Sequence, residues 1–309
     1  MTRDDRAAGS VVNALTIDVE DYFHVSAFDD VVDRSSWDGR ERRVVVNTDR
    51  LLALLDRAQV RATFFVLGWV ADREPALVRR IAAAGHEVAC HSYAHRLVYD
   101  LTPDAFRDDL RRAKACIEEA SGLPVIGYRA PSYSITARSL WALDALVEEG
   151  FRYDASIFPV HHDRYGIPDA PRHAHQLERA AGSFLEIPPA TLQRAGLNLP
   201  VAGGGYFRLL PYSWTRYGLG SLNRREGVPG VFYLHPWEID PDQPRLPVPW
   251  LTRVRHYRNL HRTEPRLGRL LADFRFAPVA SVFAGELAAV GATRPRPPVH
   301  SPSAGAVTG

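Results

Sequence analysis

The sequence predicts an α/β fold built on a parallel β-sheet, for two reasons. Apolar strand-like runs alternate with amphipathic helix-like runs from residue 11 to residue 153, and carboxylates or histidines follow several of the strand-like runs. A chain of 309 residues with 46% hydrophobic content can bury about three quarters of its surface, enough for one large domain. Five strand–helix units before residue 160 favour a barrel or a long open sheet.

The first elements are read from periodicity. The expected strands are Val11–Asp18, Ala62–Leu67 and Glu87–Cys90, and the expected helices between them are Thr48–Ala58 and Pro75–Ala84.

The next helix carries clear end signals. Thr102 is a good N-cap, Pro103 suits the first helical position, and Gly122 follows a helix that runs to about Ala120. After it we expect strand Val125–Tyr128, helix Thr136–Glu149 and strand Phe151–Tyr153.

The pattern loosens beyond residue 160. His161, His162, His173 and His175 fall in a proline-rich segment, where surface loops are the simpler interpretation. A helix is expected over Trp214–Arg224 and a strand over Gly230–Leu234, which delivers His235 at its carboxyl end. Residues 251–276 concentrate arginine, which favours a solvated helix face over an anion-binding surface. This segment lacks the aromatic platform expected of a nucleic-acid binder, so no nucleic-acid partner is expected.

Four residues suggest a metal site. Strand side chains alternate, so Asp18 and Glu20 point to the same face, and the pair can supply an ion ligand and a general base. His91 and His95 are spaced to chelate one ion through neutral imidazoles. Solvated carboxylates with surface histidines are the competing interpretation. The placement of both groups at carboxyl ends of strands favours the metal site.

The number of cysteines and the N-terminal sequence indicate the cellular compartment in which the protein is expected. Cys90 and Cys116 are too few for a disulfide scaffold and are expected to be core thiols. The charged N-terminal residues do not resemble a secretory signal, and no apolar stretch approaches the ~18 residues that span a bilayer. We therefore expect a cytoplasmic protein, with membrane association left open.

Taken in order, five segments resemble the motifs of the polysaccharide deacetylases of the NodB-homology type, carbohydrate esterase family 4. These segments are Thr16–Asp21, His91–His95, Tyr128–Ser132, Tyr153–Ser156 and Leu234–Pro236. In addition, Val19–Phe23 and the stretch Tyr257–Phe276 are similar to the subfamily associated with exopolysaccharide gene clusters.

The resemblance implies a distorted (β/α)7 barrel in a single domain with a C-terminal extension. We expect the deacetylase catalytic domain over residues 1–240, an arginine-rich extension packed on the barrel over 241–285, and a disordered tail over 286–309.

The resemblance also implies a divalent metal, usually zinc, with His91 and His95 as ligands and Asp18 as the general base. The commonest first motif has two adjacent aspartates, but Val19 stands in the second place here. The alternation of faces selects Glu20 as the carboxylate ligand, with Asp21 as the alternative if a bulge re-aims the chain.

Further roles follow by the same resemblance. Arg129 is expected to pair with Asp18, and His235 to protonate the leaving amine. A backbone N–H of the Pro131–Tyr133 loop is expected to stabilise the oxyanion. The residues expected to bind substrate are Tyr22, Pro131, Tyr133, Asp154 and Trp237.

The favoured function is removal of N-acetyl groups from amino sugars of an exopolysaccharide or its lipid-linked precursor. An N-acetylated glycan is then the substrate, with peripheral contact to the inner membrane or a biosynthetic complex. The first alternative is hydrolysis of small amides or cyclic imides on the same barrel, as in allantoinases. The second is non-catalytic glycan binding, against which the simultaneous presence of a base and an acid argues.

Overall fold

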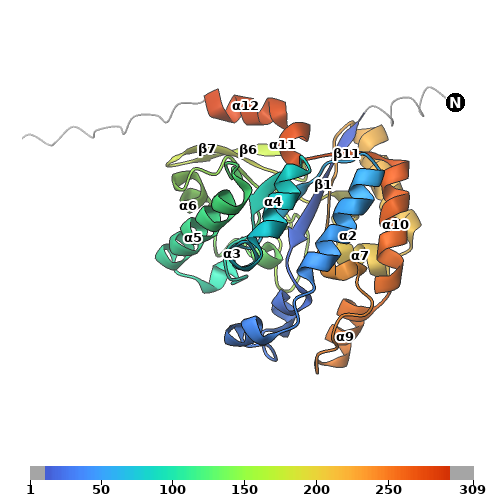
Figure 1. Ribbon diagram of the computed structural model, residues 1–309. Coiled ribbons are helices and arrows are strands. Elements are labelled where there is room, and N and C mark those ends of the chain that lie inside the picture. The colour runs from blue at the N-terminus through green and yellow to red at the C-terminus, as the bar shows by residue number, and fades with distance from the viewer. Residues whose placement is uncertain (1–10, 293–309) are drawn as a thin grey trace, which may run out of the picture.

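The computed structural model describes residues 11–292 and is organised around seven parallel strands (Figure 1). In spatial order these are β10 Val231–Leu234, β1 Val12–Val19, β2 Thr63–Val66, β3 Glu87–Cys90, β4 Gly127–Tyr128, β5 Tyr153–Asp154 and β7 Gly182–Glu186. Seven parallel strands in sequence order, apart from β10 closing back beside β1, is the arrangement expected of the distorted barrel.

The barrel is nearly closed. No ladder joins β7 to β10 among the described residues, but the N–H of Ala190, just beyond β7, donates to the carbonyl of Val231 in β10 at 3.1 Å. Strand β6 (His175–Arg179) pairs antiparallel with β7, and β11 (Arg275–Ala277) lies parallel beside the start of β1. A separate hairpin joins β8 (Thr191–Arg194) to β9 (Leu197–Pro200).

Helices cover the outside of the sheet, and α9 and α12 lie at opposite ends of the molecule (Figure 1). The α-helices are α2 Val44–Arg57, α3 Gly68–Arg73, α4 Pro75–Ala83, α5 Pro103–Ser121, α6 Ala142–Glu148, α7 Gly204–Leu209, α8 Tyr212–Ser221, α9 Trp250–Tyr257, α10 Leu260–Asp273, α11 Val279–Val282 and α12 Ala284–Ala292. Short helical turns are η1 Tyr22–His24, η2 Ser26–Phe28, η3 Arg34–Gly39, η4 Val98–Asp100, η5 Pro131–Tyr133, η6 Leu222–Glu226 and η7 Pro236–Ile239. Across residues 11–292, none of these helices has the length and apolarity needed to cross a bilayer.

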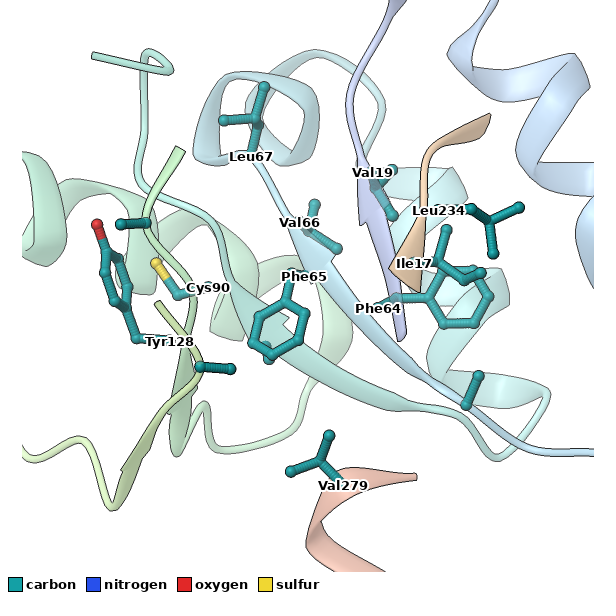
Figure 2. Close-up of a cluster of buried hydrophobic side chains, with 14 of the residues drawn as sticks. Ile17, Val19, Phe64, Phe65, Val66, Leu67, Cys90, Tyr128, Leu234 and Val279 are labelled. Atoms are coloured by element: carbon teal, nitrogen blue, oxygen red, sulfur yellow. The ribbon is translucent and has the colours of Figure 1, made fainter. Parts of the chain in front are cut away.

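The core lies between the sheet and these helices (Figure 2). Ile17 and Val19 of β1 meet Phe64 and Val66 of β2, and all four are fully buried. Cys90 belongs to the same core, as expected from its place in a buried strand, and burial raises the pKa of its thiol. Alternate residues of the same strands, including Thr16 and Asp18, are buried on the other face, where Arg129 reaches both of them.

Several sequence expectations are confirmed to within a few residues, and α5 has the predicted caps. Thr102 accepts a hydrogen bond from the N–H of Ala105, and Gly122 adopts φ of 70°. The helix expected from Thr136 begins only at Ala142, because the preceding residues form turns held by Ser139.

The C-terminal expectation is corrected in part. Residues 286–292, expected to be disordered, belong to α12, whose Leu287 and Val290 are buried. The carbonyl of Leu287 also accepts a hydrogen bond from Arg152, which ties α12 to the start of β5. The remainder of the expected tail, residues 293–309, lies outside the described residues.

Candidate metal centre

The first part of the site lies at the carboxyl end of β1. Asp18 is still in the strand and Glu20 follows directly after it, and both side chains are about 2% exposed. The neighbouring Asp21 turns elsewhere, because its carboxylate accepts hydrogen bonds from the N–H groups of Tyr22, Arg43 and Val44. Asp21 therefore fixes the chain leaving β1 rather than facing the histidines.

The second part follows β3, where a loop carries His91 and His95. Nδ1 of His91 lies 2.7 Å from the carbonyl oxygen of Arg129, a contact in which the ring donates, so Nε2 is left as the lone-pair nitrogen. His95 adopts φ of 49° and Ser92 φ of 62°. Left-handed backbone at two residues other than glycine is strain of the kind that concentrates at functional sites.

Glu20, His91 and His95 converge on one point. Oε2 of Glu20 lies 2.7 Å from Nε2 of His95 and 4.0 Å from Nε2 of His91. Among the described residues, these three form the one group of histidine, cysteine or carboxylate side chains spaced to hold a metal ion.

The surroundings of His91 and Glu20 favour the protonation states in which these side chains bind a metal ion. Burial lowers the pKa of His91 to about 4, so its imidazole is neutral at physiological pH. Burial alone would raise the pKa of Glu20, but the surrounding His95, His235 and His91 outweigh it and hold that pKa well below its usual value. A carboxylate and a neutral imidazole are the forms that bind zinc.

Beside this cluster, Asp18 forms a buried ion pair. Nη1 of Arg129 lies 2.7 Å from Oδ1 of Asp18 and also donates to the hydroxyl of Thr16 at 2.7 Å. The guanidinium is fully buried and lies over the ring of Phe65, with 4.2 Å between Cζ and the ring centroid. The structure thus brings Asp18 and Arg129 together as the sequence predicted.

A third group completes the site from β10. Nε2 of His235 lies 3.8 Å from Oδ2 of Asp18 and 3.7 Å from Oε1 of Glu20. Its Nδ1 lies 3.1 Å from Oε2 of Glu238, which also accepts the backbone N–H of His235. Burial lowers the pKa of His235, but the charges of Glu20, Glu238 and Asp18 overcome this effect and raise it to about 9.

Glu238 is in turn held by a buried arginine. Nε of Arg208, in α7, donates to Oε1 of Glu238 at 2.8 Å, and both side chains are almost fully buried. The remaining guanidinium nitrogens of Arg208 donate to the carbonyls of Arg255, His256 and Arg258 at the end of α9. The catalytic face of the barrel is therefore linked to the C-terminal segment through charged hydrogen bonds.

Glu20, His91, His95, Asp18 and His235 line one cavity of about 150 Å³. Its walls are formed by Asp18, Glu20, Val25, His91, His95, Ala130, Ser132, Tyr133, Tyr165, Tyr233, His235 and Trp237. Trp237 is fixed there because its indole N–H donates to Oε1 of Glu20 at 3.1 Å.

Three residues expected to bind substrate do not line the cavity. Tyr22 packs edge-on against Phe23 in the core, and Pro131 is buried at the start of η5. Asp154 is fully buried, accepting from the hydroxyl of Ser156 at 2.5 Å and lying opposite Glu186 in the register of β5 and β7. Burial raises the pKa of Asp154 to about 6.

Sequence reasoning missed four residues that the structure places in or behind the site. Tyr165 and Tyr233 line the cavity, whereas Glu238 and Arg208 lie behind His235. Only Glu238 had a local signal, since a carboxylate three residues after a candidate catalytic histidine can fold back onto it. Tyr165 lies in a loop, Tyr233 on a strand face and Arg208 in the short helix α7, and no periodicity in the sequence identifies them.

Comparisons with known proteins agree with this geometry. Residues 23–150 match the family model "Polysaccharide deacetylase", and residues 155–284 match a domain of unknown function, DUF3473. Residues 23–150 are thus similar to the polysaccharide deacetylases, a family of hydrolases.

Individual relatives point the same way. The chain is 27% identical over 158 residues to "Peptidoglycan deacetylase-like protein FGM2" of Gibberella zeae, which is 50% of this chain and 46% of that protein. It is 31% identical over 98 residues to a peptidoglycan-N-acetylglucosamine deacetylase of Bacillus cereus, covering 31% of this chain and 36% of that protein. It is 32% identical over 98 residues to a chitooligosaccharide deacetylase of a Bradyrhizobium species, covering 32% of this chain and 45% of that protein. In each case the match spans less than half the length of the relative.

The fold has a solved counterpart. A crystal structure from Mycobacterium smegmatis, itself described only provisionally as a polysaccharide deacetylase, superposes with a TM-score of 0.62 at 23% identity and covers 93% of both chains. This likeness extends through the second half of the chain, beyond the segment that the deacetylase model matches.

Proposed function

We propose that the protein is a metal-dependent hydrolase that removes N-acetyl groups from amino sugars of an exopolysaccharide or of its lipid-linked precursor. The observation that carries this proposal is the convergence of Glu20, His91 and His95 in one cavity with Asp18 and His235. A metal-ligand set, a base and an acid within 4 Å of their neighbours are the parts that amide hydrolysis needs.

The ligand set fits a zinc ion. Oε2 of Glu20 is buried 2.7 Å from Nε2 of His95 and 4.0 Å from Nε2 of His91, and no hydrogen bond of normal geometry satisfies it. A buried carboxylate oxygen without a hydrogen bond is costly unless a cation satisfies it. When bound there, a divalent ion supplies Lewis acidity to the acetamide carbonyl and to the attacking water.

Asp18 is the proposed general base. Its Oδ1 is engaged by Arg129, which leaves Oδ2 facing the cavity to accept a proton from water. The ion pair with Arg129 fixes the orientation of the Asp18 carboxylate, so the base is in position before the substrate arrives.

His235 is the proposed general acid. The carboxylates of Glu238 and Asp18 beside it favour the protonated imidazole, which supplies the proton that the departing amine requires. The contact between Nδ1 and Glu238 fixes the ring, so that Nε2 presents this proton to the cavity.

The proposed oxyanion donor is the N–H of Ser132. In the loop Pro131–Tyr133, proline has no N–H and the N–H of Tyr133 already donates to the carbonyl of Ala130. Ser132 lines the cavity in a left-handed conformation, with φ of 52°. One such donor typically lowers the barrier by about 3 kcal/mol.

The volume of the cavity limits which part of the substrate can enter it. At about 150 Å³ it is smaller than typical ligand sites of roughly 300–1,000 Å³, so we propose that it receives the acetamide group while the sugar rings lie outside. Tyr133 and Trp237 at its wall are the proposed sugar contacts. The Bacillus and Bradyrhizobium relatives bear names of deacetylases of N-acetylated glycans, which supports this substrate class.

The test is acetate release from N-acetylglucosamine oligomers by metal-stripped protein with and without added zinc. We expect zinc-dependent release that is lost in Asp18→Asn, although this variant retains zinc. Allantoin and simple acetamides serve as competing substrates. Release of product from these alone would favour the small-amide alternative, and glycan binding without any hydrolysis would favour the non-catalytic one.

A further inference from the structure

Helix α9 and the segment before it expose an unusual combination of side chains. At the start of the helix, Trp250 is 75% exposed and Leu251 is 46% exposed. Trp250 is the most exposed large hydrophobic residue among the described residues. Pro247 and Pro249 beside them are also exposed. We call the exposed side chains of residues 245–258 the α9 surface.

The same surface carries uncompensated positive charge. Residues 244–263 contain neither aspartate nor glutamate, whereas the α9 surface has arginine at 245, 253, 255 and 258, and Arg262 follows it in α10. All five are exposed, and within the described part of the chain none forms an ion pair with a carboxylate. Exposed arginines elsewhere are commonly paired, such as Arg80 with Asp49 and Arg111 with Glu149.

The α9 surface lies beside the mouth of the cavity. The imidazole of His256 stacks on Trp237, a wall of the cavity, with ring centroids 4.2 Å apart. Arg255 is near enough to His162 to act on it electrostatically, and His162 stacks at 3.7 Å on Tyr165, another wall residue. Figure 1 shows α9 projecting from the end of the molecule at which β1 ends.

We propose that the α9 surface docks on an anionic lipid bilayer and so presents the cavity to a substrate held at that bilayer. Trp250 and Leu251 would enter the headgroup region, and the arginines would face lipid phosphates. An aromatic ring with an aliphatic neighbour among unpaired cations is the composition of interfacial anchors. An anionic glycan would also attract arginine and stack on Trp250, but the exposed aliphatic side chain of Leu251 beside that ring offers a glycan neither a hydrogen bond nor a charge, so the lipid surface fits better.

This inference deepens the proposed function, on which it rests for the identity of the substrate, whereas docking itself can be measured without catalysis. The experiment is co-sedimentation of the full chain with vesicles of phosphatidylcholine containing 30% phosphatidylglycerol, and with vesicles of phosphatidylcholine alone. We expect binding to the anionic vesicles at low salt and release at high salt.

Two variants locate the interaction. Arg253→Gln with Arg255→Gln should weaken binding by roughly fivefold for each charge removed. Trp250→Ala should weaken it as well, and this loss should persist when salt is varied. The matched control is Arg224→Gln with Arg225→Gln, which removes the same charge from two exposed arginines of η6, next to the Asn223 that contacts Asn13 at the start of β1. This control should bind as the wild type does.

Equal losses in the control and the α9 variants would overturn the proposal, because net charge rather than this surface would then be responsible. Binding to a soluble polyuronate without binding to vesicles would also overturn it, in favour of a glycan. Acetate release from soluble oligomers should be unchanged in the α9 variants. Vesicle binding by a wild type that releases no acetate would contradict the proposed function while leaving the docking surface intact.

Discussion

At the residue scale, the site combines two buried ion pairs, Asp18 with Arg129 and Glu238 with Arg208. The first pair contains Asp18, the proposed base, and the second positions His235, the proposed acid, through the contact between Glu238 and the imidazole. Because all four groups are buried, removing one partner leaves the other charged in a medium that solvates it poorly.

The first prediction concerns Arg129→Met. We expect the free energy of unfolding to fall by about 3–5 kcal/mol, because Asp18 loses its counter-charge in a buried position. Urea denaturation measures this loss. Adding Asp18→Asn removes the stranded charge, so the double variant should lose less stability than the sum of the two single variants, and strict additivity would refute the coupling.

The second prediction uses two adjacent glycines of α7. A Cβ at Gly204 would overlap the carboxylate of Glu238, whereas a Cβ at Gly205 would meet nothing within 4 Å. Gly204→Ala should displace Glu238 from His235 and lower kcat for amide substrates by about tenfold or more, with Gly205→Ala as the matched control.

The substrate dependence separates this effect from general damage. Hydrolysis of 4-nitrophenyl acetate, whose phenolate leaves without being protonated, should be affected much less in Gly204→Ala. Equal losses on both substrates would show that Glu238 does not act through the leaving-group proton.

The position of a single residue in the site could be predicted from the sequence where a local pattern, such as strand alternation or a family motif, determines it. The alternation of β1 placed Asp18 and Glu20 on one face, and the resemblance supplied Arg129 and His235, all of which the structure brings together. Tyr22, Pro131 and Asp154 were expected at the cavity because of their motifs. Their backbones turn them into the core, which no local pattern reveals.

At the element scale, strands and helices with strong end signals were predicted well, and short hairpins were missed. Helix α5 has both of its predicted caps. The hairpin β8–β9 turns through Ala195 and Gly196, whose φ angles are 49° and 77°. Two-residue turns of this kind usually have asparagine, aspartate or glycine at the first position, so Ala195 gave no signal of a hairpin. The hairpin β6–β7 lies in a segment where prolines and histidines suggested loops.

The third prediction concerns His86, which joins two elements of the sheet. Its Nδ1 accepts the N–H of Ala62, just before β2, and burial, with a smaller contribution from Arg61, lowers its pKa to about 4. Between pH 6.5 and pH 4, His86 is therefore protonated in the unfolded chain but neutral in the folded chain. The free energy of unfolding falls as the pH falls through this range.

His86→Asn should retain an acceptor for Ala62 but remove this titration. We expect the difference in Tm between pH 7 and pH 5 to be smaller in the variant than in the wild type, as measured by calorimetry at both pH values. An unchanged difference would mean that His86 does not resist protonation in the folded state.

At the scale of the whole molecule, the proposed centre joins the ends of β1 and β3, and the C-terminal segment packs behind it through contacts with Arg208 and Trp237. Parallel order and strand number could be predicted from the alternation of elements and the family resemblance. The near closure through Ala190 and the return of β11 to β1 could not, because they depend on contacts between residues far apart in sequence.

The fourth prediction is that zinc stabilises the entire fold. A ligand present at 1,000 times its Kd adds about 4 kcal/mol to the free energy of unfolding, so EDTA should lower Tm by several degrees and zinc should restore it. His91→Ala should be insensitive to both reagents. A Tm that does not respond to zinc in the wild type would exclude tight binding to the folded state.

The zinc content of purified Glu20→Gln and Asp21→Asn identifies the carboxylate that binds the metal, because the two variants neutralise buried carboxylates that are adjacent in sequence. We expect Asp21→Asn to retain about one zinc ion per chain, as in the wild type, and Glu20→Gln to retain none. Loss of zinc from Asp21→Asn with retention in Glu20→Gln would contradict the metal centre described here.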